Sequence, residues 1–109
     1  MTALEMKRKA EILGILVNTA DHPDYVISLA RAAVEKGKTV RIHFSGPGVN
    51  LLSKTGIGSL TDVVQATVCA ESLSKYGHPA AGDDLEGVRV VPATKLGRFI
   101  SDCRRYVSF

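Results

Sequence analysis

The sequence predicts an α/β domain built on a parallel β-sheet with helices on both of its faces. Short apolar runs rich in Ile, Leu and Val alternate with segments whose apolar residues recur at helical spacing. This alternation is typical of βαβ units, in which a helix connects two parallel strands. The 109 residues are enough for a core of their own, so we expect a single domain over residues 1–109.

Five segments have the features expected of strands. Each is a short run with apolar or β-branched residues, bounded by glycine, proline or polar residues. The predicted strands are residues 11–17, 39–44, 65–69, 88–92 and 105–109. In a parallel sheet their carboxyl ends lie together at one edge, where α/β proteins bind ligands.

Helices are expected between these strands. The longest runs from Tyr25 to Lys36, with Asp24 as its N-cap and Gly37 as its stop. The shorter ones are expected over residues 49–54, from Ser59 or Thr61 to Val64, over residues 70–76, and from a Thr94 cap to Asp102.

Composition and charge argue against two classes of partner, nucleic acids and membranes. The net charge is +3, the basic residues are scattered along the chain, and there are six aromatic residues and no tryptophan. Nucleic-acid binding requires a basic face with aromatic platforms, so we expect no nucleic-acid partner. The apolar run Ile12–Val17 is too short for a signal peptide, and no segment approaches a membrane span. We expect a cytoplasmic protein without membrane contact.

The position of Cys69 is the main chemical feature of the sequence. It ends the predicted strand 65–69 and directly precedes the predicted helix 70–76. Unpaired N–H groups at a helix start, here those of Ala70 and Glu71, favour a thiolate. Cysteine reacts as the thiolate, so Cys69 is a candidate nucleophile. The alternative is that Cys69 is a small buried hydrophobe with a structural role.

Cys103 and the three histidines provide weaker signals. In a reducing cytosol both cysteines should be thiols, and Cys103, at a predicted helix end, is interpreted as incidental. His22 lies in the first strand-to-helix loop and could polarise a thiol. His43 lies inside a strand, and His78 is expected at the far end of the 70–76 helix. No histidine pair has metal-ligand spacing and there is no C-x-x-C motif, so we expect no metal site.

Two loops should meet Cys69 at the carboxyl edge of the sheet. Asn18 and His22 belong to the first loop, and Ser45, Gly46 and Gly48 belong to the second. We expect these residues to shape a pocket beside the thiol.

The second loop also contains a near match to a phosphate-binding motif. The stretch "GVNLLSKT" has Ser53 where that motif needs its second glycine, so no nucleotide cofactor is expected. No cofactor of any other kind is indicated by the sequence.

The whole chain resembles the DsrE/DsrF-like family of small α/β proteins linked to sulfur transfer. The match consists of loose patterns in a consistent order and spacing. These are "LGILVNTADHPD", "LARAAVEKGKTV", "IHFSGPGVNLL", "VCAESLSKYG" and "LEGVRVVPATKLGRFISDCRRYVSF".

The resemblance implies a three-layer α/β/α fold with a five-stranded parallel sheet, flavodoxin-like in appearance. In sulfur-relay members of the TusD and DsrE type, a cysteine at the position of Cys69 carries sulfur as a persulfide. Many members form trimers or hexamers, so a homo-oligomer with donor and acceptor proteins of a sulfur relay is implied. The sequence adds an apolar group in a glycine-broken segment, which we expect a small monomer to leave exposed. Its members are Val49, Leu51, Leu52 and Ile57.

Two functions are therefore considered. The first is a cytoplasmic sulfur carrier or sulfurtransferase that holds sulfane sulfur on Cys69. The alternative is a non-catalytic oligomeric subunit that binds a small ligand or positions a partner protein. Thiol reactivity discriminates between them, because only a carrier needs a reactive Cys69.

Overall fold

The structure, a computed structural model, describes residues 12–53, 57–76 and 87–109. Its centre is a five-stranded sheet in the order β4-β3-β2-β1-β5, and every pair of neighbours is parallel. The strands are β1 (Ile12–Val17), β2 (Thr39–Phe44), β3 (Gln65–Cys69), β4 (Val88–Val91) and β5 (Arg105–Ser108). The predicted parallel sheet and all five of its strands are confirmed.

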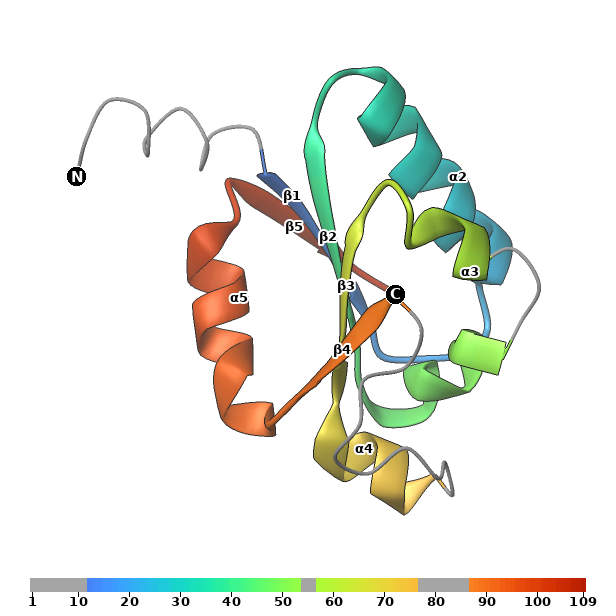
Figure 1. The fold of residues 1–109 in the computed structure, drawn as a ribbon, viewed down its shortest axis with the longest axis vertical. Helices are drawn as coiled ribbons and strands as arrows, with labels where there is room; N and C mark the ends of the chain where they lie inside the picture. The colour runs from blue at the N-terminus through green and yellow to red at the C-terminus, as the bar shows by residue number, and fades with distance from the viewer. Residues whose placement is uncertain (1–11, 54–56, 77–86) are drawn as a thin grey trace.

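Helices flank the sheet on both faces, which gives the predicted three-layer arrangement. In Figure 1, α2 and α3 lie on one side of the sheet, α5 lies on the other, and α4 follows the carboxyl end of β3. The helices are α2 (Pro23–Glu35), the 3₁₀ helix η1 (Gly46–Ser53), α3 (Ile57–Leu60), α4 (Ala70–Lys75), the 3₁₀ helix η2 (Ala93–Lys95) and α5 (Leu96–Asp102). No helix within the described residues has the length and apolarity needed to cross a membrane.

The predicted helix starts are wrong for α2, α3 and the last helix, and η1 also begins ahead of its prediction, at Gly46 instead of residue 49. Helix α2 begins at Pro23, and His22 rather than Asp24 is its N-cap. The fixed φ of proline suits the first helical position, and Asp24 in the first turn interacts favourably with the helix dipole without capping it. Helix α3 begins at Ile57, ahead of Ser59 and Thr61, so that Ile57 and Leu60 are both buried.

The third wrong start concerns the last helix. Thr94 does not cap it, because a 3₁₀ turn over Ala93–Lys95 precedes α5, and no side-chain hydrogen bond caps either helix. The chain after Pro92 therefore tightens into i→i+3 bonding before it becomes α-helical.

The predicted stop of α2 is confirmed in its geometry. Gly37 has a φ of +81°, a left-handed conformation that residues with a side chain rarely adopt. Its N–H donates to the carbonyl of Val34, and the N–H of Lys38 donates to the carbonyl of Ala33. This pair of bonds is a Schellman motif, which turns the chain from α2 into β2.

The hydrophobic core lies between the sheet and the layer formed by α2 and α3. Strand side chains alternate between the two faces of a sheet, and every second residue of the central strands is apolar and buried here. These residues are Ile15, Val17, Val40, Ile42, Phe44, Ala66, Val68 and Val88. Helix α2 covers this side of the core with its buried residues Val26, Ala30 and Ala33.

The segment expected to expose an apolar surface is instead part of this core. Val49, Leu51 and Ile57 are each at most 2% exposed, and Leu52 is half-buried. The idea that this group is left open for an oligomer contact is therefore wrong. Burial of these side chains against α2 and α4 stabilises the single chain.

The opposite face of the sheet is different in character. The alternate positions of β2, β3 and β4 carry Arg41, His43, Gln65, Thr67 and Arg89, which line an open cleft. Helix α5 is the helix on this side, and none of its residues is fully buried. Among the residues that the structure describes, α5 and the 3₁₀ turn before it therefore leave part of this polar sheet face open as a cleft.

The direction of the connections explains this difference. The chain steps from β1 to β2, β3 and β4 in one direction across the sheet, and then returns past β1 to β5. Right-handed crossovers place helices on opposite faces when the direction reverses. Leu73 of α4 joins the core on the α2 side, whereas the segment after β4 leads to α5 on the other side. The carboxyl ends of β3 and β4 thus form the topological switch point of the sheet.

A tight backbone contact at Gly48 fixes one loop at this edge. A Cβ atom on Gly48 would lie 2.1 Å from the carbonyl oxygen of Val17, closer than any real contact. The same carbonyl accepts a hydrogen bond from the N–H of Ser45, so it has little freedom to move.

We predict that Gly48→Ala lowers the free energy of unfolding by about 2 kcal/mol or more, because η1 must shift away from β1. Urea denaturation measures this change. The matched control is Gly97→Ala in α5, where an added Cβ meets nothing within 4 Å. That substitution should raise stability by about 0.5–1 kcal/mol through helix propensity. Equal stability of the two variants would contradict the contact at Gly48.

Candidate functional site

Cys69 lies at the switch point, as the last residue of β3 and the N-cap of α4. Its backbone keeps an extended conformation, with φ −71° and ψ 122°, and its side chain is 6% exposed. It pairs in register with Val91, the last residue of β4. The thiol is therefore at the level where the two neighbouring strands end and their connections diverge.

The partner of the thiol is the carboxylate of Glu71. The Sγ–H of Cys69 donates to Oε2 of Glu71 at 3.3 Å, and the backbone N–H of Ala93 donates to the same oxygen at 3.0 Å. Glu71 thus connects the start of α4 to the start of η2 across the switch point. Sequence reasoning named Glu71 for its backbone N–H and missed the role of its side chain.

The hydrogen bonds also keep Glu71 ionised. Its own backbone N–H, then the thiol of Cys69, then the N–H of Ala93 lower the pKa of this carboxyl below its ordinary value. A carboxylate beside a thiol accepts its proton in a hydrogen bond and opposes the negative charge of a thiolate. The backbone N–H of Glu71 is thus one of the groups that stabilise this carboxylate, whereas the sequence had led us to expect it to stabilise the sulfur.

The two predicted loops do meet at this edge of the sheet. The hydroxyl of Ser45 donates to Oδ1 of Asn18 at 2.7 Å, and Nδ2 of Asn18 donates to the hydroxyl of Ser108 at 2.8 Å. The N–H of Gly46 donates to the hydroxyl of Ser72, which belongs to the helix that follows Cys69. The loops after β1 and β2 are therefore connected to each other and to α4 by hydrogen bonds.

His22 has a different contact from the one expected. Its exposed ring stacks on the ring of Tyr25, with centroids 5.0 Å apart and planes 12° apart. Within the described residues the structure gives no hydrogen bond between His22 and Cys69. His78, the other histidine considered for this helix, lies outside the described residues.

Cys103 is held in a closed environment. It is 7% exposed, and its Sγ–H donates to the carbonyl of Phe99 at 3.2 Å. Burial raises the pKa of this thiol, and the charge of Arg41 offsets the effect only in part. A Cβ on Gly14 would come within 2.6 Å of its sulfur, so the packing around Cys103 is tight. These contacts agree with a structural role for Cys103.

Sequence reasoning missed the cleft under α5. This cleft has a volume of about 470 Å³ and begins next to the switch point, at Val91 and Pro92. His43 is on its floor, 2% exposed, with Nδ1 at 2.8 Å from the hydroxyl of Thr67. Burial lowers the pKa of His43, which keeps the ring neutral at pH 7. The available signal was the alternation of polar residues in "TVRIHF" and "QATVC".

The chain matches no model of a known protein family and no curated protein sequence. Among residues 12–53, 57–76 and 87–109, no group of three or more His, Cys, Asp or Glu side chains is placed to hold a metal ion. The chemistry of the site is therefore argued from Cys69, Glu71 and their surroundings.

We predict that iodoacetamide alkylates Cys69 faster than Cys103 near pH 7. The raised pKa of Cys103 and its bond to a backbone carbonyl keep its thiolate scarce. The acceptor of the Cys69 thiol is instead an exposed side chain, which can move aside. Mass spectrometry of peptides sampled over time measures both rates.

The Cys69→Ser variant is the control and should retain only the slow reaction. Glu71→Gln should accelerate alkylation of Cys69, since it removes the like charge beside the sulfur. A faster Cys103, or equal rates at the two sulfurs, would rule out Cys69 as the reactive thiol.

Proposed function

We propose that the protein is a sulfur carrier that accepts sulfane sulfur on Cys69 and passes it on. The observation that carries the proposal is the position of the thiol at the switch point, with its proton bound to Glu71. The resemblance to the DsrE/DsrF-like family supports the same chemistry at the same residue.

The transfer step needs no net oxidation. The sulfur of Cys69 attacks the terminal sulfur of a persulfide or polysulfide donor and forms a new S–S bond. The donor's own S–S bond breaks, and its remaining sulfur leaves with the electron pair. The proton of Cys69 ends on that leaving sulfur, and the onward step to an acceptor thiol is the reverse reaction.

Glu71 has a defined part in this scheme. Its Oε2 accepts a hydrogen bond from the thiol, with 3.3 Å between Sγ and Oε2, and its side chain is exposed to solvent. It is therefore a positioning residue that orients the thiol and can accept its proton when the sulfur reacts.

The second candidate function is a non-catalytic subunit that binds a small ligand. The cleft under α5 favours it, since its volume of about 470 Å³ is within the ~300–1,000 Å³ range of small-molecule sites. On this alternative Cys69 is a structural residue at the end of β3. Thiol chemistry at Cys69 separates the two functions.

We predict that polysulfide adds the mass of one or more sulfur atoms to the intact protein, and that dithiothreitol removes it. The reason is that Cys69, whose hydrogen-bond acceptor is the exposed side chain of Glu71, can exchange with sulfane sulfur once that side chain moves aside. Intact mass spectrometry is the measurement.

Cys69→Ser should lose the adduct, and the matched variant Cys103→Ser should keep it. If the wild type gains no mass, or if Cys69→Ser still gains it, the carrier function is refuted and the ligand-binding subunit is the better assignment.

We also propose that the chain forms a homo-oligomer in the cytoplasm, most simply a trimer or hexamer, and meets donor and acceptor proteins of a sulfur relay. The resemblance is the main support. The exposed edge strand β5 adds to it, because Tyr106 and Val107 are 53% and 37% exposed.

We predict that light scattering at micromolar concentration gives a mass of three or six chains. Tyr106→Lys should reduce that mass if β5 belongs to the interface, since it introduces a charge on an apolar contact. Lys38→Gln, at an exposed site at the end of α2, is the matched control. A monomer at this concentration would refute the assembly.

A further inference from the structure

The cleft between α5 and the sheet has a chemistry that Cys69 does not use. Its floor is the polar face of β2, β3 and β4, and its wall is formed by η2 and α5. Cys69 is not among the residues that line it. The side chains of this cleft therefore require an explanation of their own.

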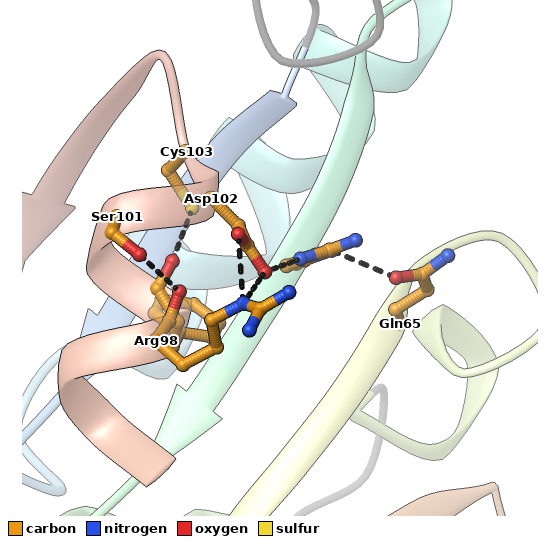
Figure 2. A network of polar contacts seen from close by, with 7 residues as sticks. Gln65, Arg98, Ser101, Asp102 and Cys103 are labelled. Carbon is orange, nitrogen blue, oxygen red and sulfur yellow. Dashed lines mark hydrogen bonds and ion pairs between the residues drawn. The ribbon is translucent and has the colours of Figure 1, made fainter. Parts of the chain in front are cut away.

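Positive charge dominates the described lining of the cleft. Arg41, Arg89, Lys95 and Arg98 line it, and Asp102 is the acidic residue among them. Asp102 binds two of the four: its carboxylate lies 3.3 Å from Nη1 of Arg41 and 3.2 Å from Nε of Arg98. Figure 2 shows the Asp102 carboxylate beside the guanidinium of Arg98. Nε of Arg41 also donates to Oε1 of Gln65, on β3, at 2.9 Å. One carboxylate cannot neutralise two guanidinium groups, so the network keeps a positive charge.

Arg89 and Lys95 add charge that is not neutralised. Within the described residues the structure gives neither side chain an ion pair or hydrogen bond, and both are exposed. Arg89 comes from β4 and Lys95 from η2, the two elements that Pro92 joins, and both side chains line the cleft. The described lining thus has a surplus of about three positive charges, which favours a doubly charged anion over a monocarboxylate.

The rest of the lining is neutral. His43 and Thr67 are hydrogen-bonded to each other on the floor. Val91, Pro92 and Phe99 provide apolar surface, and the ring of Phe99 lies 5.6 Å from that of His43. A site of about 470 Å³ with apolar walls is larger than a simple inorganic anion needs. It fits an organic body attached to the anion.

We propose that this cleft binds a small organic phosphomonoester, with Arg89 and Lys95 holding the phosphate and the Phe99 side holding the organic part. A phosphomonoester has a charge of about −1.5 to −2 at pH 7 and three acceptor oxygens. Guanidinium and ammonium groups are the side chains that recognise phosphate in proteins. The inference is independent of sulfur transfer at Cys69.

Phenyl phosphate is a suitable probe, because two related compounds test its parts separately. Phenyl sulfate keeps the shape with less charge, and inorganic phosphate keeps the anion without the ring. Titration calorimetry at low salt should give saturable binding to the wild type. Phenyl sulfate, which has one charge fewer, and inorganic phosphate, which lacks the ring, should bind at least about tenfold more weakly. Binding should weaken as salt is added, since the basic groups are exposed.

The double variant Arg89→Gln/Lys95→Gln should bind phenyl phosphate at least about tenfold more weakly than the wild type, since two charge-assisted contacts are lost. The matched control is Lys36→Gln/Lys38→Gln, which removes the same charge at exposed positions after α2. It should bind as the wild type does. Amide chemical-shift changes should be confined to β2, β3, β4, η2 and α5, the elements that line the cleft.

Cys69→Ser should bind phenyl phosphate with unchanged affinity, so loss of the carrier function and loss of this site are separable results. No saturable binding by the wild type would overturn the proposal. Equal affinity for phenyl phosphate and phenyl sulfate, or an equal loss in the two double variants, would also overturn it, because binding would then follow overall charge.

Discussion

The handedness of the crossovers is the constraint on which both sites depend. A right-handed connection keeps α2 and α3 on one face while the chain advances from β1 to β4, and it places α5 on the other face when the chain returns to β5. One face therefore receives α2 and α3, and within the described part of the chain the other face receives the short η2 and the seven-residue α5. The buried face of the sheet consists of apolar residues, and the partly covered face has arginine, glutamine and threonine. The thiol at the switch point and the cleft beside it both follow from that reversal.

The sheet could be predicted from sequence because its signals are local. Each strand is a short run with flanking breakers, and the stop of α2 is a glycine whose left-handed conformation closes a Schellman motif. The errors are at helix starts, where tertiary packing decided the outcome. Helix α3 begins earlier than predicted because Ile57 and Leu60 are both buried in the core. No N-cap residue in the sequence indicates this start. Burial of Val49 and Leu51 was missed for the same reason, since η1 has no periodicity that indicates a buried face.

The location of the candidate site could be predicted from the sequence, but the contacts of its thiol could not. The position of Cys69 followed from the strand-to-helix junction, and the meeting of the loops at Asn18, Ser45 and Gly46 followed from the parallel sheet. The contact between Cys69 and Glu71 did not follow, because it depends on a side-chain rotamer and on the N–H of Ala93, which is distant in sequence. The positive charge of the cleft could not be predicted from the sequence either. Arg41, Arg89 and Arg98 are scattered along the chain, and only the strand order brings them together.

Glu71 has a structural role that follows from the divergence of the chain at the switch point. Cys69 and Val91 end paired strands side by side, and the segments after them lead to opposite faces of the sheet. β4 ends at Val91, and Pro92 is the N-cap of η2. Divergence of this kind opens the crevice in which α/β proteins bind ligands. Here the carboxylate of Glu71 spans the crevice by binding both the thiol and the N–H of Ala93. The same side chain therefore links the start of α4 to the start of η2 and accepts the hydrogen bond of the thiol, so the join across the crevice and the surroundings of the sulfur depend on one residue.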